Sequence, residues 1–84
     1  MSSDGSRLTR PRYPMPLYVR TALSQAGLLT AYRQRPAFQQ NDYVGWISRA
    51  KQERTRLRRL EQMLDELERG DRYMNMSYHA ARKK

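Results

Sequence analysis

The stretch from Glu53 to Gly70 reads ERTRLRRLEQMLDELERG. Its apolar residues recur at intervals of three and four, which predicts one apolar stripe along an α-helix. The stripe consists of Leu57, Leu60, Leu64 and Leu67, and Met63 widens it. Gly70 is a typical C-terminal cap, so we predict a helix over 53–69, about 25 Å long. A helix of this length is only marginally stable alone in water, so its stripe has to pack on other helices.

Two shorter helices are predicted towards the N-terminus. Pro16 stands where a first helical residue is favoured, and Gly27 is a plausible stop, which predicts a helix over 17–25. A second helix begins at Leu28 and ends before Pro36, because the residue before a proline avoids the helical region.

A third helix is predicted over 41–50, with Asn41 as its N-cap and Asp42 in its first turn. No segment alternates with a period of two, so we predict no sheet. The predicted fold class is therefore all-α, a small bundle of about four helices. Its core is predicted to contain Leu23, Leu29, Tyr43, Val44, Trp46, Ile47, Leu57, Leu60, Leu64 and Leu67.

The two ends of the chain differ in composition from the part between them. Residues 1–15 combine small polar residues with closely spaced prolines, which cannot build a core. Residues 77–84 are polar and basic. We therefore expect disordered tails over 1–15 and 77–84 on either side of one helical domain over 16–76. Tyr73, Met74 and Met76 are apolar enough to fold back onto that domain.

The composition limits the classes of function. Seventeen Lys and Arg against eight Asp and Glu give a formal net charge of +9, which attracts nucleic acid, anionic membranes or acidic proteins. The chain has no cysteine, which excludes disulfides and cysteine-based zinc sites. No apolar run approaches the roughly 20 residues that span a bilayer, and no signal peptide is recognisable. We expect a cytoplasmic protein.

A pattern in the second half of the chain resembles a known family. The residues that carry it are Tyr43-Val44-Gly45-Trp46-Ile47, Ala50-Lys51, Thr55-Arg56, Arg58-Arg59-Leu60, Met63-Leu64 and Gly70. In this order and spacing they resemble the C-terminal helical domain of the YdeI/OmpD-associated proteins, also called bacteriocin-protection proteins. Members commonly have Pro-Glu where this chain has Glu53-Arg54, so the turn before the last helix is less sharply specified. The resemblance implies the helical fold more than it implies a particular biochemistry.

The candidate binding residues surround the start of the last helix. They are Lys51, Arg54, Arg56, Arg58 and Arg59, with Trp46 nearby in sequence. Cations in the first half of a helix oppose its dipole, at a cost of roughly 0.3–1 kcal/mol each when exposed. One explanation is a face that recognises anions, since guanidinium groups match carboxylates and phosphates. The other is structural: Arg56 or Arg59 pairs with Asp42 or Glu61 and joins two helices.

Nothing in the sequence indicates catalysis, a metal or a cofactor. His79 is the single histidine, and one histidine makes neither a metal site nor a catalytic pair. Ser48 and Thr55 have no base near them in sequence.

We therefore predict a non-catalytic helical interaction module, monomeric or weakly dimeric, that engages an anionic or acidic partner. The alternative is a nucleic-acid-binding module that uses the arginine-rich helix and the basic tails. Against this alternative, the same helix carries five acidic residues, which a phosphate backbone would repel.

Overall fold

A computed structural model describes residues 13–78 of the chain. Four helices follow one another: α1 (Leu17–Gln25), α2 (Leu29–Gln34), α3 (Ala37–Arg49) and α4 (Glu53–Arg69). A short antiparallel hairpin follows them, formed by β2 (Arg72–Tyr73) and β3 (Met76–Ser77). The all-α fold class is confirmed, but the prediction that there is no sheet is wrong for this hairpin. Two strands of two residues each are too short to show an alternating pattern in sequence.

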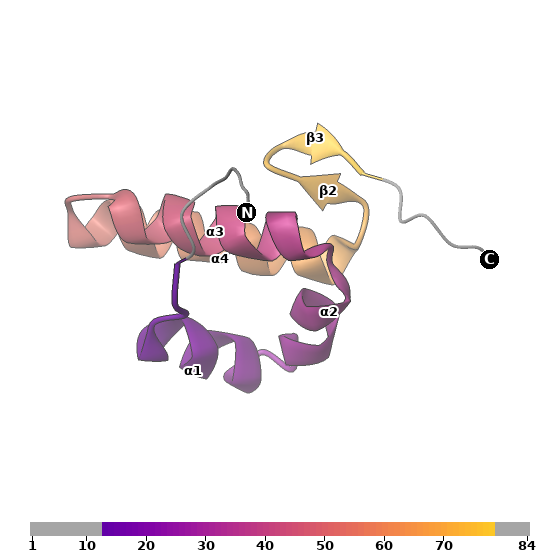
Figure 1. Cartoon of the computed structure of the whole chain (residues 1–84), viewed down its shortest axis with the longest axis horizontal. Helices are drawn as coiled ribbons and strands as arrows, with labels where there is room; N and C mark the ends of the chain where they lie inside the picture. Colours follow the sequence, from indigo (N-terminus) through magenta and orange to yellow (C-terminus); the bar gives the residue numbers. More distant parts are fainter. Residues whose placement is uncertain (1–12, 79–84) are drawn as a thin grey trace, which may run out of the picture.

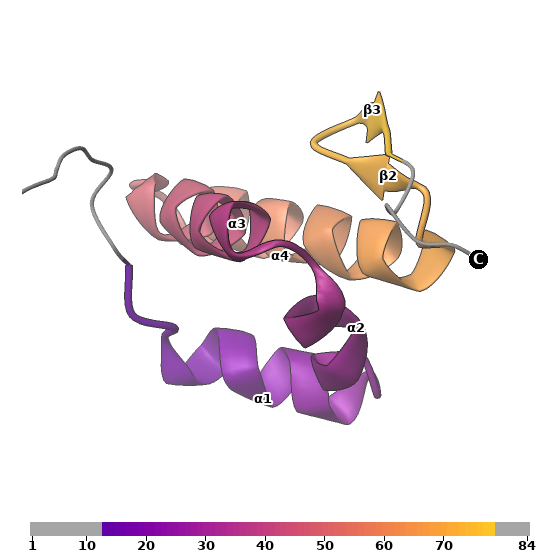
Figure 2. The same cartoon turned by 45° about the vertical axis from the view of Figure 1, so that its right-hand side comes forward.

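The helices are arranged around the α3–α4 pair (Figure 1). These two helices run side by side in opposite directions, joined by the short turn from Ala50 to Gln52. Helix α1 lies along one side of the pair, and α2 connects it to the start of α3 (Figure 2). The β2–β3 hairpin folds back over the end of α4, on the side away from α1.

The third helix begins earlier than the sequence predicted. It starts at Ala37, directly after Pro36, whose carbonyl accepts hydrogen bonds from the N–H groups of Gln39 and Gln40. Asn41 therefore lies inside the helix and is not its N-cap. The predicted bounds of α1 and α4 are confirmed, and Gly70 ends α4 with φ of 82°. Glycine adopts this left-handed conformation without a steric penalty.

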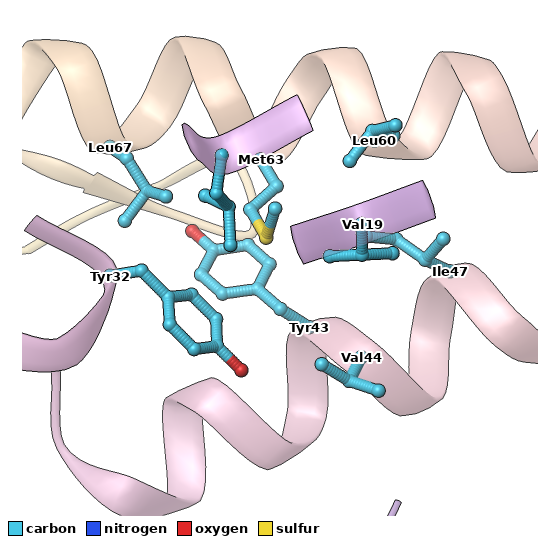
Figure 3. Packing of buried hydrophobic residues seen from close by; sticks show 9 residues of the cluster. Val19, Tyr32, Tyr43, Val44, Ile47, Leu60, Met63 and Leu67 are labelled. Carbon is cyan, nitrogen blue, oxygen red and sulfur yellow. The ribbon is translucent and has the colours of Figure 1, made fainter. Parts of the chain in front are cut away.

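All four helices contribute to one apolar core. Tyr43 lies at its centre, with Met63 and Leu67 of α4 beside it (Figure 3). The buried members are Val19, Leu23, Tyr32, Tyr43, Val44, Ile47, Leu60, Met63 and Leu67. Leu29, Trp46 and Leu64 are partly buried against this cluster, so nine of the ten predicted core residues belong to the core or pack on it.

Leu57 is the exception, because 47% of it is exposed. Successive side chains of an α-helix point about 100° apart, so Leu57 and its neighbour Arg56 face different sides of α4. Arg56 faces the end of α3, where it binds main-chain carbonyl groups. Leu57 is consequently turned out of the core.

Residues at both borders of the predicted domain contribute to the packing. Tyr13 and Met15, which the sequence assigned to the N-terminal tail, are partly buried against the core. Ser77, assigned to the C-terminal tail, pairs with Arg72 in the hairpin. The other residues of the two predicted tails, apart from Pro14 and Tyr78, lie outside the described part of the chain.

Aromatic contacts hold the hairpin against α3. The ring of Tyr73 meets that of Tyr43 edge to face, with 5.4 Å between their centres, and meets that of Phe38 in the same way at 6.2 Å. Its hydroxyl donates a 2.7 Å hydrogen bond to Asp42. Tyr73 and Met74 thus fold back onto the core as predicted, whereas Met76 is 57% exposed.

Candidate functional site: the α3–α4 corner

The α3–α4 corner, residues 49–59, carries six Arg or Lys and a single acidic residue. Arg49 contacts Tyr13, and the structure divides the other five cations into two groups. Arg59 belongs to the first: its guanidinium donates a 2.6 Å hydrogen bond from Nη1 to the carbonyl oxygen of Trp46. The same guanidinium lies 5.2 Å from the centre of the Trp46 ring. Arg59 therefore neutralises an open carbonyl near the end of α3, where the helix dipole favours a cation.

Arg56 has a similar role one turn earlier on α4. Its Nη1 donates to the carbonyl oxygens of Ala50, at 2.9 Å, and Lys51, at 3.2 Å. The structural explanation offered for Arg56 and Arg59 named Asp42 or Glu61 as partners. Within residues 13–78 the two arginines bind carbonyl oxygens instead, so they join the helices through the main chain.

Lys51, Arg54 and Arg58 form the second group and are exposed. Arg54 donates a 3.3 Å hydrogen bond from Nε to the side chain of Gln52. No carboxylate of the described residues comes within 4.0 Å of these three cations. Together with the exposed side chain of Leu57 they form what we call the basic face. Trp46, the other predicted contact residue, is half-buried behind Arg59.

The exposed charge of α4 is mainly positive at this end of the helix and mainly negative farther along. Farther along the helix, Glu61, Asp65 and Glu68 are exposed, and Asp65 forms a 4.0 Å ion pair with Arg69. The exposed charge therefore changes sign along α4, and the helix presents no continuous positive stripe. A nucleic-acid backbone would meet repulsion along half of this helix.

A second polar cluster, which the sequence analysis missed, surrounds Glu66. This glutamate is only 2% exposed. Its carboxylate accepts hydrogen bonds from the Tyr43 hydroxyl, the Gln62 amide, and the main-chain N–H groups of Met74 and Asn75, the last two at 2.9 and 2.7 Å. Met74 and Asn75 have positive φ values of 51° and 66°, as in a type I′ hairpin turn. The carboxylate thus holds the turn of the hairpin.

The hydrogen bonds around Glu66 determine its acidity. Burial alone raises the pKa of the carboxyl, but the bonds from Tyr43, the two main-chain N–H groups and Gln62 together outweigh burial and lower it. Burial and the neighbouring carboxylate raise the pKa of the Tyr43 hydroxyl. Glu66 is therefore ionised and Tyr43 protonated at neutral pH, as a structural hydrogen bond between them requires.

Arg35, which directly follows α2, belongs to the same cluster. It is buried, and its guanidinium donates 3.1 Å hydrogen bonds to the Gln39 side chain and to the main-chain carbonyl of Glu66. The guanidinium also lies 4.6 Å from the centre of the Tyr78 ring. The Glu66 cluster thus links α2, α3, α4 and the hairpin, and its contacts are structural.

The metal-ligating side chains of the described residues lie apart from one another. Within residues 13–78, no three His, Cys, Asp or Glu side chains are placed to hold a metal ion. His79 lies outside the described residues. Over the same part of the chain, no helix is both long and apolar enough to cross a membrane.

Comparison with known proteins gives one family. The family profile described as bacteriocin-protection, YdeI or OmpD-associated matches residues 12–70. The match covers all four helices and begins one residue before Tyr13. No curated protein and no solved structure matches the chain significantly.

Proposed function

Because the chain belongs to the bacteriocin-protection family of YdeI or OmpD-associated proteins, we propose that it acts as a non-catalytic interaction module of this kind. Its partner is an acidic protein, which it meets in the cytoplasm. The basic face of the α3–α4 corner, with exposed Lys51, Arg54 and Arg58, supports this proposal above all other features. Guanidinium groups without a carboxylate of their own are available to pair with carboxylates of a partner.

The apolar residue within the basic face favours a protein over a nucleic acid. Leu57 is 47% exposed and stands between Arg54 and Arg58 in sequence. An exposed leucine gains free energy when an apolar side chain of a partner covers it, whereas a phosphate backbone offers no such contact. The acidic second half of α4 argues in the same direction.

A matched pair of charge-reversal variants tests this proposal in the full chain. Arg54→Glu/Arg58→Glu changes the basic face, and Arg20→Glu/Arg33→Glu makes the same change in net charge at exposed positions of α1 and α2. The probes are a fluorescent helical peptide of Glu and Leu residues and a 20-base-pair DNA duplex, each titrated at low and physiological salt. We expect the first variant to weaken peptide binding about tenfold or more and the second about twofold or less.

Thermal unfolding followed by circular dichroism establishes that both variants are folded in the titrations. Position 54 lies in the first turn of α4, where a glutamate is favoured by the helix dipole. Equal weakening by the two variants would mean that only net charge matters, and the basic face would then have no special role. Tight, sequence-selective binding of the duplex at physiological salt would favour the nucleic-acid alternative.

A further inference from the structure

Tyr13, in the segment that precedes α1, is held at three points along one face of α3. Its main-chain N–H donates a 2.9 Å hydrogen bond to Oδ1 of Asn41. Its ring lies directly on Gly45: a Cβ atom at that position would be 2.6 Å from Cε2 of Tyr13. Real Cβ atoms do not approach other atoms so closely, so only glycine leaves room for the ring at its present position.

Arg49 provides the third point. Its Nη1 donates a 3.2 Å hydrogen bond to the Tyr13 hydroxyl, and its guanidinium lies 5.6 Å from the centre of the ring. Asn41, Gly45 and Arg49 are spaced four residues apart, which puts them in one row along α3. We call this row the Tyr13 site.

Each member of the Tyr13 site recognises a different feature of its occupant. Asn41 accepts a hydrogen bond from a main-chain N–H, Gly45 leaves room for a flat ring, and Arg49 donates to the hydroxyl at the far end of that ring. Pro14 follows the tyrosine, and the residue before a proline is biased towards extended conformations. A Tyr-Pro pair therefore loses little conformational freedom when it binds here.

We propose that the Tyr13 site binds an extended Tyr-Pro segment of a partner protein, and that the chain's own Tyr13-Pro14 competes for it. The contacts of Tyr13 define the chemistry of the occupant: a free main-chain N–H, an aromatic ring and a phenolic hydroxyl. None of these contacts involves Lys51, Arg54 or Arg58, so the proposal does not depend on the basic face. The tethered Tyr13 competes with the partner segment for the site, and its effective concentration there is on the order of millimolar.

Removal of the competitor in the full chain tests the proposal. The probe is a fluorescent synthetic peptide of residues 12–16, with the sequence RYPMP. We expect the Tyr13→Ala variant to bind it at least about tenfold more tightly than the unchanged chain, because the site is then vacant. The peptide should also shift the amide resonances of Asn41 and Gly45 in NMR spectra of this variant.

Three controls make the result specific. Tyr18→Ala removes an exposed tyrosine of α1 and should leave peptide binding as it is in the unchanged chain. Addition of Gly45→Ala to Tyr13→Ala should abolish the gain, since the methyl group occupies the place of the ring. A peptide with alanine in place of its tyrosine should not bind.

Thermal unfolding of every variant establishes that it is folded at the temperature of the titration. Equal affinity of the peptide for the unchanged chain and the Tyr13→Ala variant would overturn the proposal. Peptide binding that persists after Gly45→Ala, or that shifts resonances away from α3, would overturn it equally. If Tyr13→Ala fails to fold, Tyr13→Phe takes its place, because it keeps the ring on Gly45 and loses only the hydrogen bond from Arg49. The Tyr13→Phe variant should then bind the tyrosine peptide more tightly than the unchanged chain does, and equal affinity would refute the proposal.

Discussion

Arg59 of α4 and Trp46 of α3 are joined twice, by a 2.6 Å hydrogen bond to the tryptophan carbonyl and by a guanidinium 5.2 Å from the indole ring. This pairing gives the guanidinium of Arg59 a structural role between the two helices. The positive charge meets the C-terminal end of α3, where the helix dipole favours a cation. The arginine is therefore part of the connection between two antiparallel helices.

Arg59 and its neighbour Arg58 should consequently differ in their effect on stability. Arg59→Ala leaves the Trp46 carbonyl without its donor and should lower the free energy of unfolding by about 1–3 kcal/mol. Arg58 is exposed, so Arg58→Ala should change it by about 0.5 kcal/mol or less. Urea denaturation followed by circular dichroism measures both. Similar losses for the two variants would exclude a special structural role of Arg59.

Glu66 should be the most sensitive acidic residue of the domain. Glu66→Gln removes the negative charge and turns one of the two acceptor oxygens into a donor, which faces the N–H group of either Met74 or Asn75. We expect a loss of about 2–4 kcal/mol in the free energy of unfolding. The exposed Glu68→Gln is the matched control and should cost little. A stable Glu66→Gln variant with an intact hairpin in NMR spectra would contradict this assignment.

The lowered pKa of Glu66 also predicts how stability depends on pH. Because its pKa is lower in the folded than in the unfolded chain, the unfolded chain binds more protons in acid. The stabilisation by Glu66 is complete above the unfolded value of about 4.3 and is lost as the pH falls through the lower folded value. Urea titrations between pH 3 and 7 should show this fall in the unchanged chain and a smaller one in Glu66→Gln. If the free energy of unfolding fell equally with pH in both proteins, other carboxylates would be the cause of the acid sensitivity.

The leucines of α4 should separate into core and surface residues. Leu60 is buried, so Leu60→Ala should cost about 2–5 kcal/mol, enough to unfold so small a domain. Leu57→Ala should have a much smaller effect on stability, because the leucine is half-exposed. Thermal unfolding compares the two. If Leu57→Ala were as destabilising as Leu60→Ala, the solvent-facing position of Leu57 would be wrong.

The helical fold follows from local signals in the sequence. The three-and-four spacing of apolar residues, Gly70 and the prolines predicted the bounds of α1 and α4, since these signals act within one helix. Asn41 misled the prediction of α3 because an asparagine that caps a helix looks the same in sequence as one inside a helix. Its side chain binds the main chain of Tyr13, a contact across 28 residues.

The candidate site was predictable only in part, for a similar reason. The cations of the α3–α4 corner stood out by their conflict with the helix dipole, but their separation into two groups depends on where α3 ends. The Glu66 cluster gave no signal, because one glutamate among several on α4 becomes special only when Met74 and Asn75 fold back over it. Asn75, a residue that tolerates positive φ, was the one local indication of a turn.

The dependence of Glu66 on the hairpin affects how the chain folds as it is synthesised. Two of the groups that satisfy its carboxylate belong to residues made eight and nine positions later. While α4 is complete but Asn75 is still inside the ribosome, burial of Glu66 would leave a charge without these partners. Docking of α4 onto α3 is therefore stabilised fully only after the hairpin has emerged and its turn has closed over Glu66.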